Sequence, residues 1–192
     1  MARPRKFDET RAVTAAMNAF WRQGYEATST RDLTDRTGLG PSSLYNTFGD
    51  KRQLYLRALR RYYETNTGEQ TVLLAEPGPA KDRLRAWMVQ AIDVDLSDPE
   101  TAGCFVLNAM VEKADQDPDI KQEVRRHVTT IEHALRETVA RGQRAGEFGP
   151  ERDPAAVARQ VLSAYYGLRL LTRVYDDRQA LLDVVDGTLN AL

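Results

Sequence analysis

Five small or planar polar residues share the outward face of a short helix that the sequence predicts over residues 41–48. They are Ser42, Ser43, Tyr45, Asn46 and Thr47. The apolar residues Leu44 and Phe48 lie four positions apart and therefore share the inward face. Hydroxyl and amide groups can hydrogen-bond to base edges or to phosphate oxygens, and short side chains let a helix approach the floor of the major groove. This nearly uncharged face favours contact with DNA.

A second short helix and a tight turn are predicted immediately before this face. The pattern favours a helix over residues 30–37, with an N-cap hydroxyl from Thr28–Ser29 and with Gly38 in the left-handed conformation that ends the helix. Gly40 can then cap the next helix, and Pro41 suits its first position because the missing N–H costs nothing there. Two short helices joined by such a turn form a helix-turn-helix.

Several positions between residues 24 and 51 match the spacing of a known family. They are Gly24, Tyr25, Thr28, Ser29, Leu33, Gly38, Leu39, Leu44, Tyr45, Phe48 and Lys51. At these positions the chain resembles the DNA-binding domain of the TetR/AcrR family of bacterial transcriptional regulators. The resemblance implies phosphate contacts by Thr28, Tyr45, Thr47 and Lys51, and base-edge contacts by Pro41 and Ser43. Gly40 and Thr47 depart from the serine and histidine that are frequent in the family, so we expect a weaker cap and a shortened or lost phosphate contact at Thr47.

The charge is distributed unevenly along the 192 residues. The net charge is −1, but residues 1–61 carry twelve Lys/Arg against six Asp/Glu, and the remainder carries fifteen against twenty-two. Only the first part therefore suits a polyanion, and its coincidence with the helix-turn-helix favours phosphate binding over a merely solvated basic face. Arg3, Arg5 and Lys6 fit either an arm that lies along DNA or a disordered terminus.

The remaining sequence predicts an all-α fold, because one helical pattern follows another and no strand pattern is convincing. Helices are expected at 9–23, 51 to about 70, 80–96, 103 to about 114, 117 to 142 or 146, 153–175 and 176–192. Glu76–Pro79 is the clearest helix breaker. We therefore divide the chain into a helix-turn-helix DNA-binding domain (1–50), a connecting helix (51–75) and an effector-binding and dimerisation domain (76–192).

The last two predicted helices carry apolar residues on two sides. Such helices are either wholly buried or shared with a partner. In the family the final two helices pair with their copies as a four-helix bundle, and we favour a homodimer over a buried hairpin. The expected interface residues are Val161, Leu168, Leu171, Tyr175, Leu181, Val185 and Leu189. Tyr166, Leu170 and Val174 form a second stripe.

Aromatic, sulfur-containing and amide side chains in the second half could surround a small apolar or aromatic effector. The candidates are Trp87, Met88, Cys104, Phe105, Asn108 and Tyr165, with Asn108 as the polar anchor. Aromatic stripes usually pack as core, so that interpretation stays open for each residue. The resemblance implies that an effector shifts the connecting helix and separates the two reading helices from their half-sites, which lie about 34 Å apart.

Cys104 has two interpretations. It lies at the predicted start of a helix, where the backbone dipole lowers a thiol's pKa, so it could sense electrophiles or oxidants. The alternative is an inert buried thiol. His127 and His133 lie six positions apart and so on different helix faces, which disfavours a shared metal site.

No nucleophile–base set, paired carboxylates, metal cluster or phosphate loop has recognisable spacing, so we expect neither an enzyme nor a cofactor. The N-terminus lacks the apolar region of a signal peptide, there is no run of about eighteen apolar residues, and the single cysteine fits a reducing compartment. We therefore expect a cytoplasmic homodimer that acts as a ligand-responsive regulator, most often a repressor, on a palindromic operator. A ligand-independent architectural DNA-binding protein stays open as the alternative.

Overall fold

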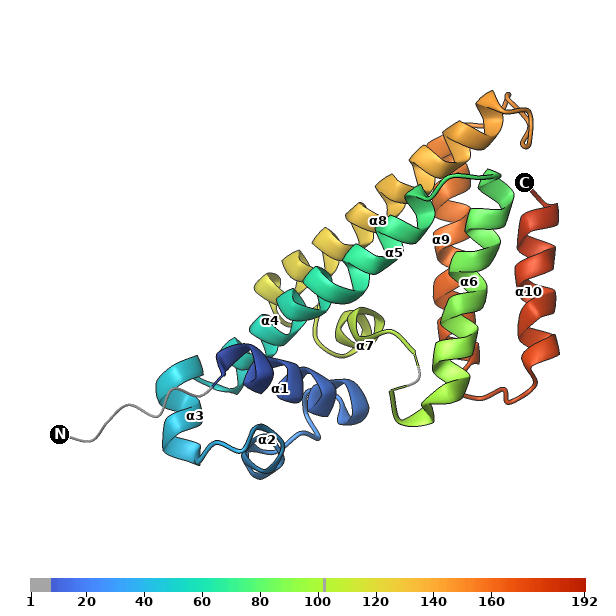
Figure 1. Ribbon diagram of the computed structural model, residues 1–192. Helices are drawn as coiled ribbons and strands as arrows, with labels where there is room; N and C mark the ends of the chain where they lie inside the picture. The colour runs from blue at the N-terminus through green and yellow to red at the C-terminus, as the bar shows by residue number, and fades with distance from the viewer. Residues whose placement is uncertain (1–7, 102) are drawn as a thin grey trace.

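The computed structural model describes residues 8–101 and 103–192, and every regular element within them is helical. This confirms the predicted all-α fold. The predicted basic arm of Arg3, Arg5 and Lys6 lies outside the described residues. Helices α1 to α3 gather at one end of the molecule, and α6, α9 and α10 form the other end (Figure 1). The line of α4 and α5 runs beside the long α8 and connects the two ends.

The N-terminal helices begin and end at the predicted residues. They are α1 (Glu9–Gln23), α2 (Thr30–Thr37) and α3 (Pro41–Phe48). A capping box starts α2, because the Ser29 hydroxyl accepts from the Asp32 N–H and the Asp32 carboxylate accepts from the Ser29 N–H. Gly38 has a φ of 71°, a left-handed conformation that glycine adopts without a steric penalty. Gly40 caps α3 with its backbone alone, which confirms the weak cap.

The connecting helix fills the predicted segment 51–75 and contains a π-helical turn. It consists of α4 (Lys51–Tyr62), the π turn η1 (Tyr63–Thr67) and α5 (Gly68–Ala75). The sequence pattern placed its end near Gln70, but the helix continues until the Glu76–Pro79 breaker. Within the π turn, Thr67 Oγ1 lies 2.6 Å from Nδ1 of the buried His127. A π turn changes the helical register without a distinctive residue type, so periodicity alone does not reveal it.

The remaining helices follow the predicted order. They are α6 (Ala80–Ser97), the 3-10 turn η2 (Pro99–Thr101), α7 (Phe105–Glu112), α8 (Pro118–Arg144), α9 (Pro154–Leu171) and α10 (Arg178–Asn190). Asp117, Asp153 and Asp177 cap α8, α9 and α10 with their carboxylates. α9 ends four residues before the predicted Tyr175, where the buried Thr172 hydroxyl donates to Asp95 Oδ2 at 2.7 Å. None of the helices in the described ranges is long and apolar enough to cross a bilayer.

The hydrophobic core divides into two clusters. The first joins α1 to α4 with α7 and the beginning of α8, and the second joins α5, α6, α9 and α10 with the rest of α8. Phe105 of α7 packs against Tyr55 and Tyr62 of α4, with ring centroids 5.5 and 5.7 Å apart. α7 therefore lies within the predicted effector-binding range but packs against α4, in the same core cluster as α1 to α3.

Candidate nucleic-acid interface

Helix α3 presents the polar face that the sequence predicts. Leu44 and Phe48 are buried and anchor the helix to α1, α2 and α4 through the first core cluster. Pro41 and Ser43, the two predicted base contacts, are exposed at the beginning of the helix. The absence of charge on this short face lets it approach a groove without desolvating a lysine or an arginine.

Two hydroxyl groups along α3 are held by neighbours within the chain. The Tyr45 hydroxyl lies 2.5 Å from Thr30 Oγ1 at the beginning of α2, and Thr47 Oγ1 donates to the Ser43 carbonyl at 2.8 Å. Both side chains are half-buried. A hydroxyl has one donor and two acceptor sites. The bond between Tyr45 and Thr30 uses only one O–H of the pair and leaves the other for a phosphate oxygen, whereas Thr47 has to turn from the Ser43 carbonyl before its O–H can donate to a phosphate. The bond between Tyr45 and Thr30 also fixes α3 against α2.

Thr28 is placed differently from the expectation. It is fully buried, and its Oγ1 donates to the Gly24 carbonyl at 2.6 Å. The hydroxyl therefore supplies a hydrogen bond to the carbonyl of Gly24 at the end of α1 and holds the segment between α1 and α2 in place. The structure contradicts the predicted phosphate contact of Thr28, because its side chain has no surface to offer.

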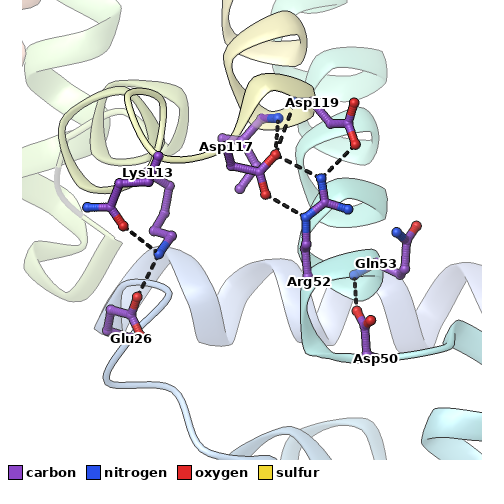
Figure 2. A network of polar contacts seen from close by, with 9 residues as sticks. Glu26, Asp50, Arg52, Gln53, Lys113, Asp117 and Asp119 are labelled. Carbon is purple, nitrogen blue, oxygen red and sulfur yellow. Dashed lines mark hydrogen bonds and ion pairs between the residues drawn. The ribbon is translucent and has the colours of Figure 1, made fainter.

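Lys51 starts α4 beside the segment that links α1 to α2. Its Nζ lies 4.5 Å from the centroid of the Tyr25 ring and 3.4 Å from the Glu26 carbonyl oxygen. Asp50 caps the same helix by accepting from the Gln53 N–H at 2.7 Å (Figure 2). The cation thus stands at a rigid helix start, partly exposed.

Arg52 connects α4 to the beginning of α8 (Figure 2). Its Nε and Nη2 donate to both oxygens of Asp117 at 2.5 and 2.8 Å, and Nη2 also reaches Asp119 at 2.6 Å. The hydrogen bonds from Arg52 lower the pKa of Asp117 to about 2. The same carboxylate caps α8, so a single side chain joins the helix cap to the connecting helix.

The C-terminal end of α7 holds the segment before α2. The Glu112 carboxylate accepts from the backbone N–H groups of Tyr25 and Glu26, both at 2.8 Å, and Lys113 Nζ donates to the Glu26 carboxylate at 2.7 Å. Figure 2 shows the contact between Lys113 and Glu26. Sequence reasoning missed these contacts and those of Arg52, because the partners lie 65 to 87 positions apart and carry no local signal.

Part of the positive charge in the first 61 residues is neutralised within the chain. Arg22, Arg57 and Arg60 pair with Glu100, Glu9 and Glu123, in addition to the pair of Arg52. Arg31 and Arg36 on α2 are exposed. The cations that face solvent near α3 are therefore fewer than the sequence count suggests.

The predicted pocket residues divide between several places. Trp87 and Tyr165 stack at a centroid distance of 3.8 Å and line a cavity of about 80 Å³ between α1, the α4–α5 line, α6 and α9. Met88 and Phe105 are buried in the core and do not line it. Asn108 accepts from Arg173 at 3.2 Å and lines a separate groove between α1, α7 and α9. The structure thus brings together only two of the six candidates at a cavity.

Cys104 is buried as the N-cap residue of α7. Burial raises the pKa of its thiol, but hydrogen bonding to His127, the charges of His127 and Arg169 and a hydrogen bond with Tyr62 together lower it to about 7. The Tyr62 hydroxyl lies 3.5 Å from the sulfur. His133 is exposed on α8, away from this cluster. Within the described residues no group of three His, Cys, Asp or Glu side chains could hold a metal ion.

Most of the predicted dimer-interface residues are core residues of the protomer. Five of them are buried in the second core cluster: Val161, Leu168, Leu181, Val185 and Leu189. That part of the prediction is wrong, because these side chains already pack against α6 and α8 and have no area left for a partner. Leu171 is half-buried, and Tyr175 is 49% exposed. Leu170 and Val174 of the second stripe are 48% and 73% exposed.

Two family profiles match the chain. The profile of bacterial regulatory proteins of the tetR family covers residues 12–58, and that of the tetracyclin repressor-like C-terminal domain covers residues 80–187. The HTH-type transcriptional regulator YezE of Bacillus subtilis (strain 168), itself uncharacterised, is 31% identical, with all of both chains covered. The HTH-type transcriptional repressor ComR of Escherichia coli (strain K12) is 27% identical, over 97% of this chain and 90% of ComR.

A solved structure agrees over the same length. A cysteine mutant of the TetR family transcriptional regulator CifR, complexed with 26-base-pair operator DNA, is 27% identical. It superposes with a TM-score of 0.87 and covers 98% of this chain and 99% of its own. These relatives are transcriptional regulators and not enzymes. The matched profiles and the full-length relatives show that the chain belongs to the TetR family of bacterial DNA-binding transcriptional regulators.

Proposed function

We propose that the protein binds a palindromic operator as a homodimer and releases it when a small apolar or aromatic effector occupies the cavity beside Trp87 and Tyr165. The exposed polar face of α3 carries the proposal, because Pro41 and Ser43 are free to approach base edges. Tyr45, Thr47 and Lys51 supply the proposed phosphate contacts, and Thr28 supports them from the core. The operator complex of CifR, a relative over the whole length, supports this assignment.

The proposed dimer uses the outward side of α9 and α10. Leu170 near the end of α9 and Val174 and Tyr175 just beyond it are exposed, with Leu170 also at the edge of the groove that holds Asn108, and Leu171 of α9 and Leu182 of α10 are half-buried. Exposed large apolar side chains that gather in one region often mark a contact with another protein surface. A two-fold axis here places two copies of α3 on half-sites about 34 Å apart.

Helix α7 provides a path between the cavity and the DNA-binding helices. Arg169 lines the cavity and donates to the Gly103 carbonyl just before α7, while Glu112 at the other end holds the N–H groups of Tyr25 and Glu26. A ligand that displaces Arg169 therefore moves α7 and the segment that precedes α2. An effector that binds the displaced state more tightly lowers operator affinity by the same coupling free energy.

The thiol of Cys104 favours a second candidate, a sensor of electrophiles or oxidants. A pKa of about 7 makes a large fraction of the sulfur thiolate at neutral pH, the form that reacts. Cys104 is the residue immediately before α7, so a modification of its thiol would act on the same connection between the cavity and the DNA-binding helices. Its burial argues for slow reaction, since the thiolate is accessible only when the surrounding helices open.

The phosphate contact of Lys51 gives the first test. On an operator selected from a random pool, Lys51→Ala lowers affinity for all sequences and reduces the salt slope of log K by about one, whereas Ser43→Ala alters base preference and leaves the slope unchanged. Fluorescence anisotropy at several salt concentrations measures both. Lys81→Ala on the distant α6 is the control. An unchanged salt slope for Lys51→Ala contradicts the proposed phosphate contact of Lys51.

The dimer surface gives the second test. The double substitution Leu170→Glu and Val174→Glu places charges in the apolar group and should yield monomers in sedimentation velocity. Operator affinity should fall by about 10² to 10⁴, because the second reading helix is no longer tethered. Val72→Glu on α5, which is also exposed, is the matched control and should remain dimeric. A double variant that stays dimeric contradicts the proposed surface.

Filling the cavity gives the third test, which separates a ligand-responsive regulator from an architectural protein. Compounds that raise the melting temperature of the wild type should leave that of Ala91→Met unchanged, because the larger side chain occupies the cavity. The same compounds should release operator DNA from the wild type only. If every stabilising compound leaves operator affinity unchanged, the architectural alternative holds.

The thiol gives the fourth test. Alkylation of Cys104 by iodoacetamide forms a sulfur–carbon bond and releases iodide, and its rate should rise with pH through about 7 as thiolate forms. His127→Gln removes the hydrogen bond and the charge that lower the pKa, so the rise should move toward the ordinary thiol value. Cys104→Ser should not react. Alkylation that leaves operator affinity unchanged excludes the sensor.

A further inference from the structure

The cavity beside Trp87 and Tyr165 combines an aromatic, buried part with a polar, exposed part. The aromatic side chains that line it are Trp21, Tyr62, Trp87 and Tyr165, and Glu69 and Gln90 line it with polar groups. Trp87 and Tyr165 are buried, whereas Glu69 and Gln90 are exposed and so stand at its mouth. The volume of about 80 Å³ holds roughly six waters, which is room for a compact molecule and not for a long chain.

The polar groups beside the stacked rings have partners within the chain. Gln70 Oε1 accepts from Trp87 Nε1 at 3.0 Å and from the Tyr165 hydroxyl at 3.4 Å. Arg169, which also lines the cavity, pairs with Asp95 at 2.8 Å and donates to the Tyr165 hydroxyl at 3.2 Å. The positive charge of Arg169 is therefore balanced, and these bonds hold the two rings in place.

Glu69 carries the unbalanced charge of the cavity. No residue in the part of the chain that the structure describes pairs with its carboxylate or donates a hydrogen bond to it, and the same holds for the side-chain carbonyl of Gln90. The nearby Glu64, in contrast, pairs with Arg61 at 3.9 Å. Because the charges of Arg169 and Asp95 cancel, the cavity has one uncompensated negative charge, and it stands at the mouth.

These groups favour a ligand that donates hydrogen bonds and carries a positive charge. A carboxylate only accepts hydrogen bonds, and an ammonium group offers three donors and no acceptor, so it complements Glu69 beside the carbonyl of Gln90. Aromatic rings around the cavity add to the attraction, since the face of a ring is negative. An anion is repelled by Glu69. The body of the ligand, next to Trp87 and Tyr165, has to be apolar or aromatic.

We infer that this cavity binds a compact organic cation, with an apolar or aromatic body among the rings and an ammonium group at the mouth beside Glu69 and Gln90. The inference rests on the proposed ligand response and adds a positive charge to the chemistry of the effector. Glu69 lies in the first turn of α5, directly after the π turn. The ammonium group therefore contacts the connecting helix itself, in addition to the path through α7.

Three probes of one ring size test the charge of the ligand by isothermal titration calorimetry with the full-length protein. At neutral pH cyclohexylamine is a cation, cyclohexanol is uncharged and cyclohexanecarboxylate is an anion. Cyclohexylamine should bind about fivefold more tightly than cyclohexanol, the ratio expected for one partly exposed ion pair, and the carboxylate should bind most weakly. The ratio should shrink as the salt concentration rises. Equal binding of the three, tighter binding of the anion, or no binding of cyclohexylamine overturns the inference.

A matched pair of variants assigns the preference to one carboxylate. Glu69→Gln removes the charge and keeps the size of the side chain, so cyclohexylamine and cyclohexanol should then bind equally. Glu64→Gln removes the same charge from the same connecting helix but away from the cavity, and should keep the ratio of about five. The ratio between probes is compared within each variant, so a general loss of stability cancels. An unchanged ratio in Glu69→Gln contradicts the inferred site.

Operator DNA separates the two proposals. If cyclohexylamine binds with the expected selectivity but leaves operator affinity unchanged, the proposed ligand response fails while the chemistry of the cavity stands. If the compound screen finds only uncharged or anionic effectors that release the operator, and cyclohexylamine does not bind, the ligand response stands and the inferred charge is wrong.

Discussion

A buried guanidinium group organises the second half of this protein. Arg169 of α9 is almost entirely removed from water, so its charge needs a partner and its N–H groups need acceptors, which Nη1 and Nη2 have and Nε lacks. Asp95 of α6 supplies the opposite charge, Tyr165 supplies a hydroxyl, and the Gly103 carbonyl supplies an acceptor just before α7. Thr172 donates to the other oxygen of Asp95 and ends α9. Three helices therefore have a common fixed point, and a change in it affects all of them.

The DNA-binding helices are tied to this fixed point by polar contacts rather than by apolar area alone. α7 starts beside Gly103 and ends at Glu112, which caps two N–H groups of the segment before α2. Arg52 adds a tie between α4 and the cap of α8. Hydrogen bonds of this kind depend on direction, so a rotation of α7 weakens them at once, whereas an apolar contact tolerates small shifts. The connection is therefore sensitive to the orientation of α7.

Local sequence signals predict the helix boundaries well. Which side chains are buried depends on long-range packing, and the sequence patterns do not predict it. The caps and turn at Ser29, Gly38 and Pro41 act within a few residues, so the helix-turn-helix boundaries follow from sequence. Which apolar side of α9 and α10 packs inside the protomer depends on distant helices, and stripes such as that of Val161 were consequently assigned to the wrong surface. Thr28 was misplaced for a related reason, since its acceptor is a backbone carbonyl that composition does not mark. The cavity lies where five helices meet, and no single sequence pattern predicts that these helices come together.

The π turn between α4 and α5 also determines how the two ends of the molecule are aligned. An α-helix rotates by about 100° and rises by about 1.5 Å for each residue, so one residue more or fewer in this turn reorients everything on its far side. Because α4 packs with the reading helices and α5 with the C-terminal bundle, the length of this short stretch sets the angle between α3 and the two-fold axis of the proposed dimer. Relatives that differ by one residue here are thus expected to prefer operators with a different spacing between half-sites, even if their reading helices are identical.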